Sequence, residues 1–207
     1  MITLTAAFQT AKENMHFDET LLQHCQADGQ PRLRIYTWNT SSLTYPKRSA
    51  SLFDAYQTLD HSDRLTGGGI VCHAKNDLVW TFAQPIPNIK TPLKTCLCAL
   101  SDWIKTSLAR HNLQVEKTIP TPIEKNILYC LTYESPYELY HNGQKIAGIA
   151  IRKFQNTHLV QGIIHREISP SFPELTALSL PKTQGLQAPH LTPEKLSQTL
   201  FENFTLR

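Results

Sequence analysis

Two stretches of the sequence combine glycines with a basic side chain, an arrangement suited to holding an anionic or strongly polarised oxygen. The first is RLTGGGIVCH, residues 64–73, and the second is GQKIAGIAIR, residues 143–152. Glycine lets the backbone approach a ligand closely because no Cβ intervenes, although ordering it costs roughly 0.5–1 kcal/mol relative to alanine. A fixed cation beside backbone N–H groups stabilises a phosphate or an oxyanion in a dry pocket. Each stretch is therefore a candidate for the wall of a ligand pocket.

The three consecutive glycines fit neither of two common phosphate-binding loops. A P-loop needs Lys followed by Ser or Thr after its last glycine, and no such pair follows Gly69. A dinucleotide fingerprint opens a helix, whereas Gly69 opens a run of β-forming residues. The remaining interpretations are a strand or turn whose backbone lies flat against a ligand, and a turn with a purely structural role.

A third candidate for chemistry is Cys130, in the run NILYCLTY, residues 126–133. A cysteine forms a thioester through its thiolate, which requires a base or a cation nearby, and Lys145 could supply that cation. A cysteine inside an apolar run is otherwise a small buried hydrophobic residue. Both interpretations stay open.

The composition is that of an ordinary globular domain. The 207 residues are 41% hydrophobic and 18% charged, with a formal net charge of +3. There is no basic block typical of nucleic-acid binding, no apolar run near the roughly 18 residues that span a membrane, and no signal-peptide pattern at the start. Five scattered cysteines favour reduced thiols and a cytoplasmic protein, and no Cys or His pair at zinc spacing follows Cys96 and Cys98, so we predict no metal site.

The elements that must position these residues are several strands between three helices. Helices are predicted over residues 15–25, from an N-cap at Thr91 with Pro92 at the first helical position, and from an N-cap at Thr192. Asn142 and Gly143 indicate a type I′ hairpin turn. Strands are predicted over residues 32–38, 70–73, 78–82, 113–119, 126–133, 137–153 and 158–168, with 70–73 and 78–82 forming a hairpin.

Because strands do not alternate one-for-one with helices, we predict an α/β fold of the α+β type. Its sheet is mixed, mostly antiparallel and flanked by helices. The length favours one domain over residues 1–207.

Three segments resemble the signature motifs of lipoate–protein ligases, members of the biotin/lipoate ligase superfamily. Residues 64–73 are similar to R-x-[ST]-G-G-G-x-V-x-H, and residues 143–152 to G-x-K-I-[AS]-G-x-A-x-R. NMHFDETLL, residues 14–22, is similar to the N-M-A-L-D-E-x-L-L opening of these enzymes. The three segments lie in the family's order, and the resemblance implies the fold of its catalytic domain.

The resemblance also implies an activity. These enzymes join lipoate or octanoate to AMP, using ATP with Mg²⁺ as a substrate, and pass the acyl group to a lysine of a lipoyl domain. The implied acceptors are E2 subunits of 2-oxoacid dehydrogenases and the H protein of glycine cleavage. We expect the enzyme itself to bind no nucleic acid, no membrane and no metal tightly. Lys145 would be the catalytic residue that bridges the acyl oxygen and the phosphate. The residues implied to bind the acyl-adenylate are Arg64, Thr66, Gly67, Gly68, Gly69, Val71, His73, Ala147, Gly148 and Ala150.

Some positions depart from the ligase pattern. Asp63 stands in place of an arginine, Asp77 in place of an asparagine, and QGI at residues 161–163 in place of H-G-[ST]. The sequence also ends at Arg207 without the C-terminal accessory domain of longer ligases. We therefore expect one of two enzymes. The first is a short ligase, which acts alone or with a separate accessory subunit, and the second is an acyltransferase that needs no ATP.

The acyltransferase alternative rests on CLTYESPYEL, residues 130–139. It resembles the C-x₄-[PS]-x-Y-E-L stretch of octanoyltransferases in which the cysteine holds the acyl chain as a thioester, so Cys130 is the possible nucleophile. Those transferases tend to replace the third glycine with arginine, whereas Gly69 keeps the ligase form. The sequence therefore favours the ligase over the octanoyltransferase. A third alternative is a catalytically inactive protein that binds lipoyl ligands.

Overall fold

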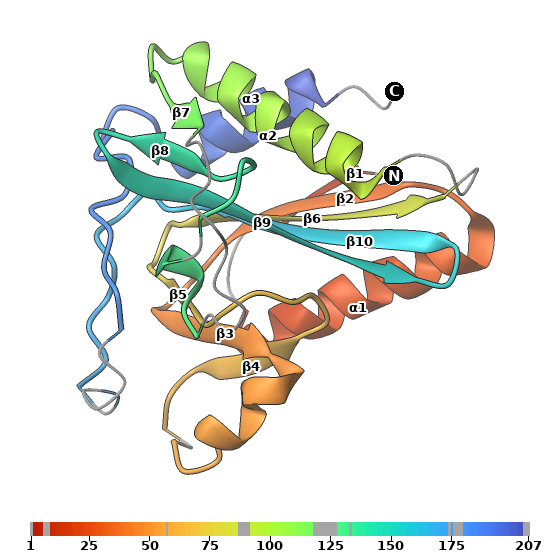
Figure 1. The fold of residues 1–207 in the computed structure, drawn as a ribbon, viewed down its shortest axis with the longest axis horizontal. Coiled ribbons are helices and arrows are strands. Elements are labelled where there is room, and N and C mark those ends of the chain that lie inside the picture. Colours follow the sequence, from red (N-terminus) through yellow and green to blue (C-terminus); the bar gives the residue numbers. More distant parts are fainter. Residues whose placement is uncertain are drawn as a thin grey trace.

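A seven-stranded sheet forms the centre of the molecule. The computed structural model describes residues 2–5, 9–56, 58–86, 92–117, 128–132, 134–173, 175 and 180–204. Within these residues the strand order is β1-β2-β6-β10-β9-β8-β7, with β1 and β2 parallel and the other neighbours antiparallel (Figure 1). The predicted fold class is confirmed. The strands are β1 (Ile2–Thr5), β2 (Arg32–Thr37), β6 (Leu78–Pro85), β7 (Glu116–Lys117), β8 (Leu139–His141), β9 (Gln144–Phe154) and β10 (Thr157–Ile164).

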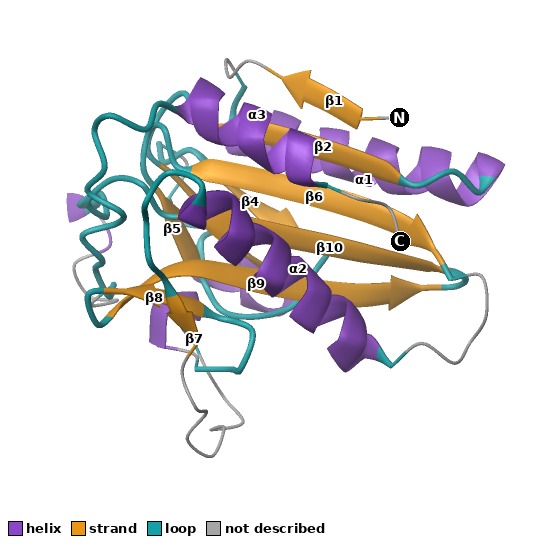
Figure 2. Cartoon of the chain, turned by 90° about the horizontal axis from the view of Figure 1, so that it is seen from above, coloured by secondary structure: helices purple, strands orange, loops and turns teal. Residues whose placement is uncertain are grey.

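Helices cover both faces of this sheet. The helices α2 (Leu93–Ala109) and α3 (Pro193–Asn203) lie on one face, and α1 (Ala11–Asp28) lies on the other (Figures 1 and 2). Because side chains alternate along a strand, β6 contributes side chains to the packing on both faces of the sheet. Trp80 packs into the core under α2 and α3, whereas Val79 packs with Met15 of α1.

A second, three-stranded sheet lies beside α1 and was not foreseen. Its order is β4-β3-β5, formed by β3 (Ser42–Pro46), β4 (His61–Arg64) and β5 (Val71–His73), with the 3₁₀ helix η1 (Lys47–Leu52) after β3. The hairpin predicted from residues 70–73 and 78–82 is therefore wrong. β5 pairs with β3, and the turn after it leads β6 into the main sheet.

The helix signals were largely right. α1 begins earlier than predicted, because Thr10 and Glu13 form a capping box, and it ends at Gly29 in the left-handed conformation. α3 has the predicted Thr192 cap and proline at the first turn. Thr91 lies outside the described residues, and α2 begins at Leu93 with Pro92 at the cap position.

The strand predicted over residues 126–133 is wrong where the structure describes it. Cys130–Thr132 form a 3₁₀ turn, η2, and Tyr129 makes an isolated bridge with Ile70. The remaining positions of that prediction (126, 127 and 133) lie outside the described residues, as do 118 and 119 of the strand that contains β7. The hairpin of β8 and β9 turns at Asn142 and Gly143 as predicted, both with positive φ. In the described part of the chain no helix is long and apolar enough to cross a membrane.

Candidate active site

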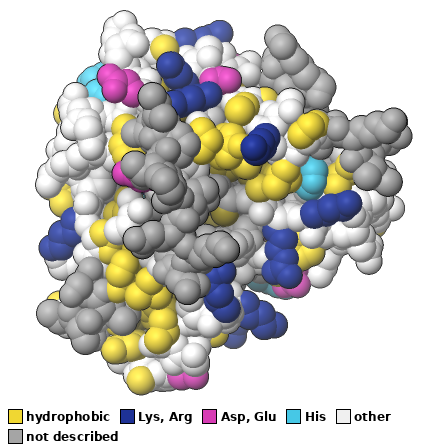
Figure 3. Space-filling view, in the orientation of Figure 1, with side chains coloured by type: hydrophobic (Ala, Val, Ile, Leu, Met, Phe, Trp, Pro, Cys, Tyr) yellow, Lys and Arg dark blue, Asp and Glu magenta, His cyan; other side chains and the backbone are white. Residues whose placement is uncertain are grey.

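A cavity of about 420 Å³ lies between α1, the small sheet and strands β9 and β10. Its volume is in the range of roughly 300–1,000 Å³ that small-molecule sites occupy. Figure 3 shows hydrophobic side chains gathered over β9 and β10, with Lys and Arg side chains around them. The apolar part of the cavity wall includes Met15, Tyr36, Trp38, Val79 and Ile163.

The glycine-rich turn forms one wall, and Gly69 has a packing reason to be glycine. A Cβ at this position would lie 2.5–2.6 Å from backbone atoms of residues 128–130. Two hydrogen bonds hold this approach: Ile70 N–H donates to the Leu128 carbonyl at 2.7 Å, and Cys130 N–H donates to the Ile70 carbonyl at 2.9 Å. The third glycine thus sets the position of Cys130. Gly68 has φ +92°, where a side chain is strained.

Arg64 holds the turn together from inside. Its buried guanidinium donates to the carbonyls of Gly67 at 2.7 Å and Gly69 at 2.6 Å. Burial lowers the pKa of Arg64 to about 10, and interaction with Cys130 opposes that shift. Arg64 therefore stays charged at neutral pH beside the cysteine.

His73 forms part of the cavity wall as a neutral ring. Its Nε2 lies 2.8 Å from Thr44 Oγ1, and its ring is 4.2 Å from the ring of Trp38. Burial, with smaller effects from His165 and Arg64, lowers the pKa of His73 well below its usual range. Among the described residues its buried Nδ1 has no hydrogen-bond partner.

Lys145 is buried in an ion pair next to the cysteine. Its Nζ lies 2.8 Å from Glu138 Oε2 and donates to the Cys130 carbonyl at 2.7 Å. Burial lowers the pKa of Lys145, but the charges of Cys130 and Glu138 outweigh burial, so its pKa is raised. Burial raises the pKa of Glu138. A Cβ at Gly148 would lie 3.0 Å from Glu138 Oε2 and 3.5 Å from both Cys130 Sγ and Lys145 Cε, so the three side chains converge at this glycine.

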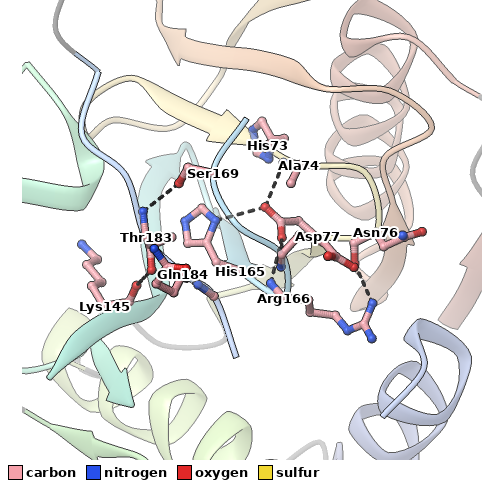
Figure 4. A network of polar contacts seen from close by, with 12 residues as sticks. His73, Ala74, Asn76, Asp77, Lys145, His165, Arg166, Ser169, Thr183 and Gln184 are labelled. Carbon is pink, nitrogen blue, oxygen red and sulfur yellow. Dashed lines mark hydrogen bonds and ion pairs between the residues drawn. The ribbon is translucent and has the colours of Figure 1, made fainter. Parts of the chain in front are cut away.

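The chain that follows β10 fixes the backbone of Lys145 through Thr183. Thr183 Oγ1 donates to the Lys145 carbonyl at 3.0 Å, and Figure 4 shows the lysine side chain pointing away from this network. The same segment is anchored by Asp77, which lies 3.1 Å from His165 Nδ1 and accepts from Arg166 N–H at 2.8 Å. Asp77 therefore has a structural role in this chain.

The segment of residues 14–22 contributes a buried polar network under the cavity. Asp18 pairs with Arg34 at 2.9 Å and accepts from Gln161 Nε2 at 2.7 Å. Gln161 Oε1 in turn accepts from Thr66 Oγ1 at 2.6 Å. Gln161, which replaces a histidine of the ligase pattern, has both amide atoms bonded to protein and still lines the cavity.

The structure brings most of the expected site residues to this one cavity. Those that line it are Arg64, Gly68, Gly69, Val71, His73, Cys130, Gly148 and Ala150. Four are not among the lining residues. Lys145 pairs with Glu138, Gly67 accepts a hydrogen bond from Arg64 within the turn, Thr66 donates to Gln161, and Ala147 packs in the core. Their parts in binding and catalysis stay predictions. Glu138 was missed as a site residue, although it stands in the Y-E-L segment that marked the transferase resemblance. Within the described chain no cluster of His, Cys, Asp or Glu could hold a metal ion.

Comparisons with known proteins agree with this geometry. The model of the family "Lipoyl protein ligase A/B catalytic domain" matches residues 10–172. Octanoyltransferase LipM of Staphylococcus aureus (strain NCTC 8325 / PS 47) is 29% identical over 171 residues, covering 75% of this chain and 62% of that protein. The chain thus spans about three fifths of the length of the curated relatives it matches.

Two solved structures share the fold. Protein Ta0514 of T. acidophilum with bound lipoic acid has a TM-score of 0.70 and 16% identity, over 98% of this chain and 83% of that one. Lipoate-protein ligase A bound with ATP has a TM-score of 0.69 and 14% identity, over 99% of this chain and 82% of that one.

Proposed function

Because the chain belongs to the lipoyl protein ligase A/B catalytic-domain family, we propose that it is an octanoyltransferase that holds the acyl chain on Cys130 as a thioester. The observation that carries the proposal is the convergence of Cys130, Lys145 and Glu138 at Gly148 on the cavity wall. The similarity to an octanoyltransferase, LipM, supports it. The acceptor would be a lysine of an apo lipoyl domain and the donor an octanoyl-carrier thioester.

The reaction needs two transfers. The Cys130 thiolate attacks the carbonyl carbon of the donor thioester; a C–S bond to the enzyme forms, and the carrier leaves as its thiolate, which takes up a proton. The ε-amine of the acceptor lysine then attacks the acyl-cysteine, a C–N bond forms, the Cys130 thiolate leaves, and the amine loses its extra proton. No ATP is consumed, because the thioester is already activated.

The residues around Cys130 suit these steps. Lys145 and Arg64 place two cations near Cys130, and a nucleophilic cysteine needs a cation or a base nearby. The apolar wall formed by Met15, Val79 and Ile163 suits a hydrocarbon chain.

A ligase that forms acyl-AMP is the second candidate, because Gly69 keeps the ligase form of the glycine motif. That argument is weaker with the structure in hand, since packing against residues 128–130 by itself requires glycine there. In the ligase interpretation Lys145 must also contact a phosphate, whereas here its Nζ is engaged by Glu138 and the Cys130 carbonyl. The two candidates share the acceptor and differ in their need for ATP and Mg²⁺.

The test is a transfer assay to an apo lipoyl domain with two donors. Octanoyl-carrier protein without ATP should give product, and octanoate with ATP and Mg²⁺ should not. Cys130→Ala should lose the transfer, while Cys98→Ala, which removes an exposed cysteine of α2, should keep it. Product that forms only with ATP and persists in Cys130→Ala would make the ligase the function.

A further inference from the structure

We propose that Glu138 is a specificity-determining residue: its carboxylate cancels the charge of Lys145 at the cavity wall, so that the site accepts uncharged acyl thioesters and rejects anionic acyl adenylates. This inference rests on the proposed function and deepens it. It concerns the class of acyl donor that the site can take.

The geometry places the carboxylate at the cavity. Glu138 lines the cavity, and Lys145 is not among the described residues that do so. The two side chains are 2% and 4% exposed, and their charged atoms are 2.8 Å apart. Ser135 Oγ donates to Glu138 Oε1 at 3.2 Å, which fixes the carboxylate from its other side. Glu138 therefore presents its carboxylate to the cavity, with the Lys145 ammonium paired to it.

The count of charges at this end favours a neutral donor. With the Cys130 thiolate formed, the two cations near the sulfur, Lys145 and Arg64, already face two anions, the thiolate and the Glu138 carboxylate. In an acyl adenylate the carbonyl carbon is bonded to an oxygen of a negatively charged phosphate. The adenylate would therefore bring a third anion into a buried site. A thioester carries sulfur at that place and no charge. Like charges repel strongly where water is excluded, so the adenylate is disfavoured.

The other cations near the cavity do not replace Lys145 in this role. Arg64 spends donors on the carbonyls of Gly67 and Gly69 at the glycine turn. Arg48 is exposed and donates to the Gly68 carbonyl at 2.9 Å. Both spend these donors on the turn, whereas the Lys145 and Glu138 side chains converge with Cys130 at Gly148.

The test compares two probes on wild type, Glu138→Gln and Glu134→Gln. The variant Glu138→Gln keeps the size of the side chain and removes its charge; Glu134 is an exposed carboxylate on the same segment and is the matched control. The first probe is octanoyl-sulfamoyl-adenosine, an unreactive anionic analogue of the adenylate, whose Kd is measured by calorimetry. The second is octanoyl-N-acetylcysteamine, an uncharged thioester, whose acylation of the protein is followed by intact-mass spectrometry.

We expect Glu138→Gln to bind the anionic analogue at least about tenfold more tightly than wild type, and Glu134→Gln to match wild type. Unchanged or weaker binding by a folded Glu138→Gln would overturn the proposal. If that variant does not fold, wild type alone decides: it should bind an uncharged carbamate isostere of the analogue at least about tenfold more tightly than the sulfamate, and equal affinities would overturn the proposal.

The result also separates this inference from the proposed function. Acylation of Cys130 by the thioester, together with no effect of Glu138→Gln on the analogue, would remove only the role of Glu138. Tight binding of the anionic analogue by wild type, together with no acylation of Cys130, would remove both.

Discussion

In the described part of the chain, two buried ion pairs that involve Arg or Lys differ in what surrounds them. Arg34 of β2 and Asp18 of α1 are 2.9 Å apart and are 5% and 1% exposed. Lys145 and Glu138, 2.8 Å apart, are 4% and 2% exposed. By distance and burial the two pairs are equivalent, yet only the second has a member in direct contact with the reactive end of the cavity.

The difference lies in the remaining partners. Asp18 accepts hydrogen bonds from Tyr36 and Thr81 as well as Gln161, all from strands of the main sheet. Such saturation suits a pair that holds an element in place, since a buried polar network is stable when every member is bonded. Glu138 instead shares its surroundings with a cysteine and a cavity. Burial alone therefore does not distinguish a structural pair from a functional one; the neighbours of the pair do.

Replacing Lys145 should have the largest effect. Lys145→Met removes the cation beside Cys130 and should slow octanoyl transfer by about 10²–10³-fold, the loss typical of removing one preorganised electrostatic group from an active site. It should also lower the free energy of unfolding by about 3–5 kcal/mol, because the Glu138 carboxylate is left buried and unpaired. Transfer rates and urea unfolding measure the two effects. In Lys145→Met/Glu138→Gln we expect stability to recover and activity to stay lost; a near-wild-type rate in either variant would contradict the role of Lys145.

The structural pair should respond in the opposite way. Asp18→Asn leaves Arg34 buried without its counter-charge and should cost about 3–5 kcal/mol of unfolding free energy. A loss of stability of this size still leaves a typical domain mostly folded, so the rate can be measured below the unfolding transition. The rate of transfer per folded molecule should stay within about threefold of wild type, because neither Asp18 nor Arg34 lines the cavity. A large loss of rate in fully folded Asp18→Asn would mean that the Asp18–Arg34 pair also contributes to catalysis, and that its role is not only structural.

Crowding the Lys145–Glu138 pair should have a moderate effect. In Gly148→Ala the added Cβ would lie 3.0 Å from Glu138 Oε2 and must displace it. We expect about 1–3 kcal/mol of lost stability, typical of overpacking, and a transfer rate about tenfold lower. Gly67→Ala is the control, since a Cβ there meets no atom within 4 Å. Equal rates in the two variants would show that the convergence at Gly148 is unimportant.

The smallest effect is a pH dependence of stability from His73. Its pKa is lowered in the folded protein, so below the unfolded value of about 6.5 the unfolded chain binds a proton that the folded protein does not. Stability should therefore fall as the pH drops below about 6.5, and this one group contributes up to about 1.4 kcal/mol per pH unit. Urea unfolding between pH 5 and pH 7.5 should show a shallower dependence in His73→Gln. Identical slopes would mean that His73 takes up a proton in the folded protein as readily as in the unfolded chain.

Much of this architecture could be predicted from the sequence where its signals are local. The Thr192 cap and the Asn142–Gly143 turn each depend on a few neighbouring residues, and both are confirmed. β3 and β4 were missed because they pair in parallel across a long connection, and their sequences carry no alternating apolar pattern.

The site residues could also be predicted only where the signal is local. Motifs identified Arg64 and Lys145, but not that each would spend its donors on protein partners. Cys130 was assigned to a strand because its neighbours are β-forming, whereas its backbone is held by Ile70 beside Gly69, some sixty residues earlier in the chain. Such contacts between distant segments have no signature in either segment.

The most direct test of the central claim is the mass of the protein after incubation with octanoyl-carrier protein in the absence of ATP and acceptor. The account predicts a single added octanoyl group, located on Cys130 by peptide mapping, absent in Cys130→Ala and discharged when an apo lipoyl domain is added. A protein that gains no acyl group, yet transfers octanoate to the lipoyl domain once ATP is supplied, would contradict it.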